Sequence, residues 1–257
     1  MKYKTITSQI DFVWRICLQY PVFAYLFRKK LLSKIKSNNL SSMLRREIID
    51  VYNYNYIKNS NYEDFVFFEG LENLKLAKNR PVILYTCHYS RFVLPLICLA
   101  KFHRILGCII NDSSGVPYVE RKFRSYKLGL MEKHMNGNFF YTNKSMHGIF
   151  KYLRNNGMLV YLIDMQASKD SKSSIKVNFM NREMLIYTSI LRLVSNSGAK
   201  LIPYVTMESK GRMYPLKCRI LKEVEIFDSD SNNQKMEKLL KPLRIIESNK
   251  MQWWLNT

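Results

Sequence analysis

The side chain best suited to chemistry in this sequence is His88, which ends an apolar run, Val-Ile-Leu-Tyr-Thr-Cys, at residues 82–87. A parallel strand that is buried on both faces reads as a continuous apolar run. Open α/β sheets keep their chemistry at the carboxyl ends of such strands. Because a histidine has an unperturbed pKa of about 6.5, it suits proton transfer near neutral pH. His88 is therefore either a general base or a structural histidine at a strand end.

A second polar residue, Asp164, ends another apolar run at residues 158–163. If the two strands are neighbours, a carboxylate that accepts the imidazole N–H fixes its tautomer and makes the other ring nitrogen a better base. Such a pair would deprotonate a hydroxyl in an acyl transfer. The alternative is that Asp164 is a turn or helix-capping residue. Arg91 either binds an anionic substrate group or a developing oxyanion, or is an ordinary surface residue.

Other catalytic motifs are absent from the sequence. There is no G-x-S-x-G, G-x-x-x-x-G-K-[ST], G-x-G-x-x-G or H-E-x-x-H, which argues against a nucleophile-elbow hydrolase, a P-loop enzyme and a zincin. His103, His134 and His147 are scattered without the spacing of metal ligands, so we predict no metal site. The five cysteines form no C-x-x-C pair, which favours reduced thiols over a disulfide framework or a zinc site.

The elements that must position His88 and Asp164 alternate between strand and helix. The sequence predicts strands at 65–70, 82–87, 108–110, 139–141, 158–163 and 201–206, and helices at 41–58, 71–78, 92–106, 118–136, 145–156, 187–197 and 234–247. This alternation of strands and helices predicts an α/β fold, a mostly parallel sheet flanked by helices on both faces. We expect a late hairpin or edge strand at 213–226. Because no repeat or low-complexity linker divides the chain, residues 1–257 are predicted to form a single domain.

The charge of the chain points to anionic partners. Forty-one Lys and Arg against twenty Asp and Glu give a net charge of +21. A field of that size attracts nucleic acid, an anionic membrane or an acidic carrier protein; a lysine-rich composition is the alternative explanation. No helix-turn-helix, zinc-finger or aromatic RNA-binding signature is visible, so a nucleic-acid-binding protein is the less favoured alternative and we expect no nucleic acid as partner.

The N-terminal residues 1–36 are predicted to form an amphipathic helical segment at a membrane surface. Residues 9–36 read as two helical pieces divided near Pro21, in which aromatic residues precede a basic cluster at 28–36. That combination is typical of helices in a membrane interface, although a helix packed on the domain would also fit. No run reaches the roughly 18 to 20 apolar residues of a spanning helix, and no signal peptide is evident. We therefore expect peripheral attachment.

The order of these motifs resembles the late lipid A acyltransferases of the lysophospholipid acyltransferase superfamily. Residues 84–88 are similar to the segment that carries the family's catalytic histidine, and residues 157–164 to the segment that ends in its Asp-Gln pair. Further similar segments are 68–72, 177–180 with Thr188, 198–203 and 251–254. The resemblance covers nearly the whole chain.

This resemblance implies an acyltransferase with catalytic His88 and Asp164 and without a cofactor of its own. The acyl or aminoacyl group would arrive on the phosphopantetheine of an acidic acyl or peptidyl carrier protein. The acceptor would be lipid A or a related anionic lipid at the cytoplasmic face of the bacterial inner membrane. We expect the substrates to be bound by basic and amide side chains, namely Arg91, Arg121, Arg124 and Gln166.

The sequence departs from the family at one position of the catalytic motif. The family carries an acidic residue five positions after its histidine, and Val93 stands there in this chain. Either another carboxylate replaces the acid, Asp164 being the first choice, or the chemistry has changed, or the protein is an inactive lipid-binding or carrier-binding relative. The chain resembles a divergent branch of the family that transfers glycine from a carrier thioester to lipid A in cationic-peptide resistance. An aminoacyl thioester is more electrophilic than a fatty one and needs less help from the missing acid.

Overall fold

The computed structural model describes residues 50, 54, 57, 61–77, 79–100, 106–110, 118–135, 138–141, 146–167, 171, 173–208 and 215–252, with the backbone alone at 118–124 and 248–252. The predicted membrane-surface segment 1–36 and most of the predicted helix 41–58 lie outside these residues. Of that helix, residues 50, 54 and 57 are described, and all three are helical.

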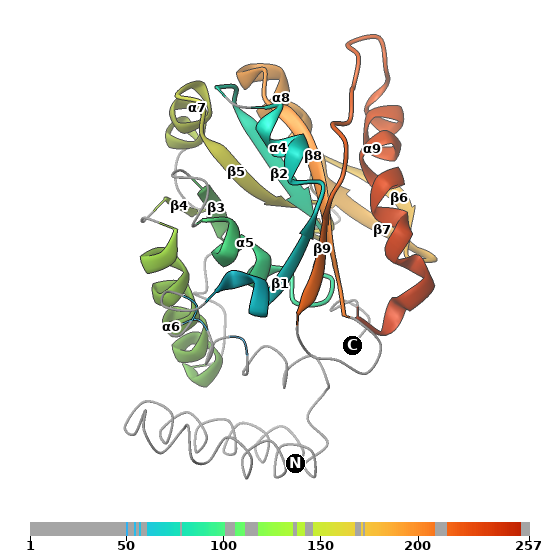
Figure 1. The fold of residues 1–257 in the computed structure, drawn as a ribbon. Coiled ribbons are helices and arrows are strands. Elements are labelled where there is room, and N and C mark those ends of the chain that lie inside the picture. Colours follow the sequence, from blue (N-terminus) through green and yellow to red (C-terminus); the bar gives the residue numbers. More distant parts are fainter. Residues whose placement is uncertain are drawn as a thin grey trace, which may run out of the picture.

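A seven-stranded sheet in the order β1-β9-β8-β2-β5-β3-β4 forms the centre of the described structure (Figure 1). Its strands are β1 (Val66–Glu69), β2 (Val82–Thr86), β3 (Leu106–Ile110), β4 (Phe139–Tyr141), β5 (Met158–Leu162), β8 (Lys200–Met207) and β9 (Leu216–Ile220). The strands from β8 to β4 run parallel, whereas β9 is antiparallel to β8 and parallel to β1. The predicted mostly parallel sheet is therefore confirmed.

Helices cover both faces of this sheet. They are α4 (Leu71–Lys75), α5 (Val93–Leu99), α6 (Tyr118–His134), α7 (His147–Arg154), α8 (Ser189–Ser197) and α9 (Asn232–Leu240), with 3-10 helices at Tyr62–Asp64 (η1) and Lys241–Gln252 (η2). Val82 and Leu84 of β2 pack in one core with α4, α5 and α6, while Ile83 and Tyr85 pack in a second core with α7, α8 and α9. Because both faces of β2 are covered, all five of its residues are buried.

A β-hairpin that the sequence did not predict lies beside α9. It consists of β6 (Ser174–Phe179) and β7 (Arg182–Tyr187), which pair antiparallel. The two residues of its turn, Met180 and Asn181, have φ values of +55° and +58°. A two-residue hairpin turn of type I′ needs positive φ at both central positions, and glycine or asparagine usually supplies it. Because methionine stands at the first position, the sequence pattern did not predict this turn.

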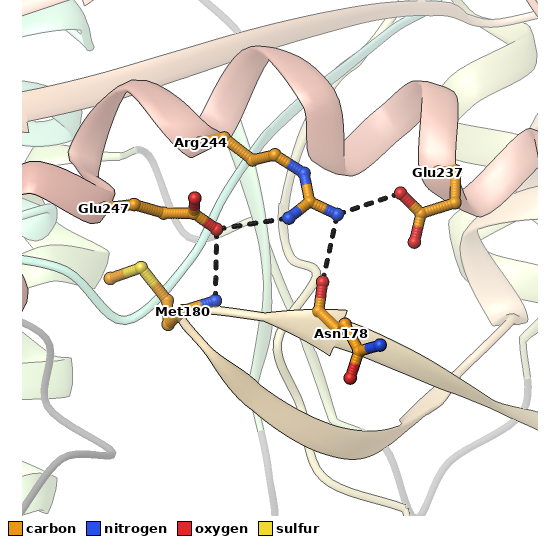
Figure 2. A network of polar contacts seen from close by, with 5 residues as sticks. All are labelled: Asn178, Met180, Glu237, Arg244 and Glu247. Atoms are coloured by element: carbon orange, nitrogen blue, oxygen red, sulfur yellow. Dashed lines mark hydrogen bonds and ion pairs between the residues drawn. The ribbon is translucent and has the colours of Figure 1, made fainter.

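Two side chains of the C-terminal segment hold this hairpin (Figure 2). The backbone N–H of Met180 donates to Glu247 Oε1 at 3.3 Å, and Arg244 Nη2 donates to the carbonyl of Asn178 at 3.0 Å. Arg244 also contacts Glu237 at 2.9 Å and Glu247 at 3.3 Å. These contacts compensate for a turn that has no glycine.

Several predicted elements differ from the structure in their limits or in their place in the sheet. The predicted helix 92–106 is shorter, because α5 ends at Leu99 and Leu106 already belongs to β3. The late strand β9 is an interior strand, because β1 pairs on its outer side. Tyr187 ends β7, so α8 begins only at Ser189.

Candidate active site

The carboxyl ends of β2 and β5 meet at one edge of the sheet. The two strands are parallel neighbours with Thr86 opposite Leu162, and the N–H of Ile163 donates to the carbonyl of Thr86 at 2.8 Å. Residues that follow the two strands must therefore emerge side by side. These residues include His88 and Asp164, the two candidates for acid–base chemistry.

His88 and Asp164 form a close pair through both side chain and backbone. The imidazole Nδ1 lies 2.8 Å from Asp164 Oδ1, and the backbone N–H of His88 donates to Asp164 Oδ2 at 2.9 Å and to Oδ1 at 3.1 Å. The Asp164 side chain is fully buried, whereas the imidazole is 23% exposed. An ionised carboxylate can only accept, so in the neutral imidazole this contact assigns the proton to Nδ1 and leaves Nε2 with a lone pair. The pair therefore has the arrangement of a histidine base and the carboxylate that orients it.

The segment after His88 is held from the side of β8. Thr206 donates its hydroxyl hydrogen to the carbonyl of Tyr89 at 3.2 Å, and the Tyr204 hydroxyl donates to the carbonyl of Phe92 at 3.2 Å. The Phe92 ring packs edge to face on the imidazole, with ring centres 5.5 Å apart. These contacts fix the direction in which the imidazole leaves the sheet.

Ser90, within this segment, has a φ of +51° and is fully buried. Non-glycine residues rarely adopt this left-handed conformation, and they persist in it only where the surrounding structure enforces it. The contacts from Thr206 and Tyr204 bracket Ser90 and supply that enforcement.

Arg91 lies in the protein interior and is paired with Asp50. Its Nε donates to Asp50 Oδ2 at 2.7 Å and a second guanidinium nitrogen contacts Oδ1, while the two side chains are 1% and 3% exposed. A substrate would reach the guanidinium only by displacing this carboxylate. The pair connects residue 50 to the segment that follows His88, and a substrate contact of Arg91 stays a prediction. Sequence analysis missed Asp50 because 41 residues separate it from Arg91.

The remaining predicted substrate-binding residues lie in two separate parts of the chain, α6 and the segment that follows Asp164. Gln166 is exposed, and its backbone forms an isolated bridge with Ile186 of β7, so the chain after Asp164 runs onto the hairpin. Arg121 and Arg124 lie in α6, where their side chains are outside the described part of the structure. Their roles in substrate binding stay predictions. Val93 is the buried first residue of α5.

The described residues contain no group of three or more His, Cys, Asp or Glu side chains placed to hold a metal ion. The thiol next to the site, Cys87, is buried, and its burial together with the charge of Asp164 raises its pKa well above the usual value. Cys87 is therefore a protonated packing residue. In the same described part of the chain, no helix combines the length and the hydropathy that a membrane crossing requires.

A histidine and a buried carboxylate at the edge of a mostly parallel sheet are suited to the activation of a hydroxyl. Residues 31–255 match the family of bacterial lipid A biosynthesis acyltransferases, and the chain belongs to this family. A solved structure of similar extent is the 1-acyl-sn-glycerophosphate (LPA) acyltransferase PlsC from Thermotoga maritima, with 19% identity, a TM-score of 0.45 and 96% of each chain covered. A search of curated proteins found no significant match.

Proposed function

We propose that this acyltransferase moves an acyl or aminoacyl group, glycyl included, from a carrier-protein thioester to a hydroxyl of lipid A or a related anionic lipid. The observation that carries the proposal is the contact of 2.8 Å between His88 and the buried Asp164 at the carboxyl ends of neighbouring strands. Membership of the lipid A acyltransferase family supports the choice of acceptor.

The proposed reaction uses Nε2 of His88 as its base. Nε2 takes the proton of the acceptor hydroxyl while the oxygen attacks the thioester carbonyl, and Asp164 stabilises the imidazolium that forms. Collapse of the tetrahedral intermediate breaks the C–S bond, and Nε2–H returns the proton to the leaving thiolate. The products are the new ester and the free carrier thiol, so no cofactor is consumed.

Asp164 provides a carboxylate at a site whose motif acid is replaced by Val93. It contacts the ring nitrogen that an orienting acid must contact, and its burial excludes water from that contact. This arrangement favours an active transferase over an inactive lipid-binding or carrier-binding relative.

Charge supports the partners and the location in the proposal. The chain carries a net charge of +21, and basic residues are concentrated at 28–36 and 118–136. Such surfaces attract anionic lipids and an acidic acyl or peptidyl carrier protein. We place the enzyme peripherally at the cytoplasmic face of the inner membrane, where its product would contribute to lipopolysaccharide modification and cationic-peptide resistance.

The test is mass spectrometry of lipid A from cells with the gene present, deleted, or carrying His88→Ala. We expect a mass increment that is lost in the deletion and lost or reduced at least about 100-fold in His88→Ala, because general base catalysis contributes roughly 10²–10⁴-fold. The size of the increment separates glycyl from fatty acyl. His147→Ala is the matched control, since His147 is exposed on α7, and it should leave the increment unchanged.

Asp164→Asn tests the orienting role separately. The amide keeps an acceptor for the backbone N–H of His88 but no longer selects the tautomer with a free Nε2, so transfer should fall by about 10²–10⁴-fold while the protein stays folded. An unchanged increment in both His88→Ala and Asp164→Asn would overturn the proposed mechanism and favour the inactive relative.

A further inference from the structure

A third ionisable residue, Glu208, lies at the same edge of the sheet as His88 and Asp164. It directly follows β8 (Lys200–Met207), which is the parallel neighbour of β2 on the side opposite β5. Three adjacent parallel strands therefore deliver Asp164, His88 and Glu208, in that order across the sheet. In open α/β folds, ligands bind along this edge.

Contacts from β8 bring the region of Glu208 against the segment that carries His88. Thr206, two residues before Glu208, donates to the carbonyl of Tyr89 at 3.2 Å, and Tyr89 directly follows His88. Glu208 is partly buried, and its Oε1 is shielded from solvent. The carboxylate thus stands next to the site in a poorly hydrated position, where charge interactions are stronger than in water.

The electrostatics of Tyr89 agree with this placement. Burial raises the pKa of Tyr89 to about 12, and the negative charge of Glu208 adds to the shift. Glu208 therefore acts electrostatically on the residue that adjoins the candidate base. A negative charge here disfavours an anionic group of a substrate and favours a cationic one, in a chain whose net charge is +21.

We propose that Glu208 binds the ammonium group of an aminoacyl donor and selects this donor over a neutral acyl group. The inference rests on the proposed function, because it specifies the donor of that reaction. In an aminoacyl thioester the ammonium is attached to the carbon beside the reacting carbonyl. A carboxylate that pairs with it must therefore lie close to the base, as the position of Glu208 after β8 allows. Glu208 takes no part in proton transfer, which His88 and Asp164 perform.

The test measures binding of two matched probes to the purified full chain by calorimetry. The probes are glycyl- and acetyl-pantetheine analogues in which an amide nitrogen replaces the thioester sulfur, so that neither can react. The wild-type protein should bind the glycyl probe at least about ten-fold more tightly, since hydrogen bonds to charged groups are the stronger ones. Glu208→Gln should remove this preference and leave the affinity for the acetyl probe unchanged.

Glu223→Gln is the matched control for the same chemical change. Glu223 is an exposed carboxylate that pairs with Lys200, the first residue of β8, at the end of the strand remote from the site. This variant should keep the preference of the wild-type protein. Glu208→Asp keeps the charge with a shorter reach and should keep part of the preference.

The outcomes separate this inference from the proposed function. Equal affinity of the wild-type protein for both probes, or an undiminished preference in Glu208→Gln, would overturn the role of Glu208. A preference that depends on Glu208, together with no transfer of an acyl or aminoacyl group from the carrier to lipid A or a related lipid, would uphold the ammonium site and refute the proposed reaction. Loss of affinity for both probes in Glu208→Gln would reassign Glu208 to a structural role.

Discussion

The buried ion pair of Arg91 and Asp50 is the residue-scale feature with the largest expected effect on stability. Removing one partner of such a pair leaves an uncompensated buried charge, which costs about 3–5 kcal/mol. We therefore expect Arg91→Met to lower the free energy of unfolding by about that amount, measured by chemical denaturation. The double variant Asp50→Leu/Arg91→Met should recover most of the loss, because it removes both charges.

Lys176→Met is the control for this prediction. Lys176 pairs with Glu183, but the two side chains are 72% and 63% exposed, so solvent screens the pair and its loss should leave the unfolding midpoint unchanged. If Arg91→Met also left the free energy of unfolding unchanged, the Arg91–Asp50 pair would have no structural role. Such a result would favour a substrate contact for Arg91.

Sequence analysis could find some of the site residues and not others. His88 and Asp164 stand out because each follows an apolar run, and runs of this kind predict strand ends. Asp50 has no such signal, since its importance comes from its contact with Arg91, which is distant in the sequence. Glu208 also follows an apolar run, at 201–207, but only the pairing of β8 with β2 places it beside His88. The family's catalytic motif indicates that its acidic residue is replaced here by Val93. The contact of Asp164 with the ring nitrogen of His88 follows only from the pairing of β2 with β5 in the structure.

At the scale of elements, two glycines have opposite roles. Gly70 begins α4 with a φ of +80°, and a Cβ added there would lie 2.0 Å from the carbonyl oxygen of Ile220. Gly129 lies within α6, and nothing is within 4 Å of an added Cβ. The first glycine permits a close approach of two backbones, whereas the second only weakens its helix.

We therefore predict opposite changes in stability for the same substitution. Gly70→Ala should destabilise the fold by about 2–4 kcal/mol, because it combines a left-handed backbone with overpacking against a carbonyl. Gly129→Ala should stabilise it by about 0.5–1 kcal/mol through the higher helix propensity of alanine. Urea denaturation of the two variants checks both signs. A neutral Gly70→Ala would mean that α4 and β9 are further apart than the structure has them.

The hairpin β6–β7 shows why some elements could not be predicted. Its turn carries Met180 and Asn181 in a conformation that usually requires glycine, and the compensating contacts come from Arg244 and Glu247, more than sixty residues later in the chain. Local sequence patterns predict an element when the local residues determine it. Here a remote element determines the turn.

At the scale of the whole molecule, the two cores on either side of the sheet each contain buried thiols. Cys87 belongs to the core with α7, α8 and α9, and Cys108 and Cys218 belong to the core with α4, α5 and α6. Burial raises the pKa of all three thiols, to about 12 for Cys108. Because the thiolate is the reactive form, these cysteines should be inert in the folded protein.

We expect iodoacetamide at pH 8 to leave all three unlabelled in the native protein and to label them fully in guanidinium chloride, as measured by peptide mass spectrometry. At intermediate denaturant, labelling of Cys87 and of Cys218 reports the opening of the two cores separately. Rapid native labelling of Cys87 would show that the edge of the sheet at His88 opens readily to solvent.

The alternation of apolar runs and helices was sufficient to predict the α/β class, because a strand buried on both faces and a helix with one apolar face have different periods. The order of strands in the sheet was not predictable. The order depends on pairings between distant strands, such as that of β1 with β9, and no local sequence pattern predicts these pairings.

This pairing has a consequence for how the protein is made. β1 is among the first parts of the sheet to leave the ribosome, but its neighbour β9 follows about 150 residues later, as the contact of Glu69 with Arg219 illustrates. At roughly 5–20 residues per second, the interval is about 8 to 30 s. Throughout that time the apolar Val66, fully buried in the finished fold, has no strand beside it. The nascent chain thus carries an unpaired strand for most of its synthesis, and a ribosome that stalls before residue 216 presents an aggregation-prone edge to the chaperones of the cell.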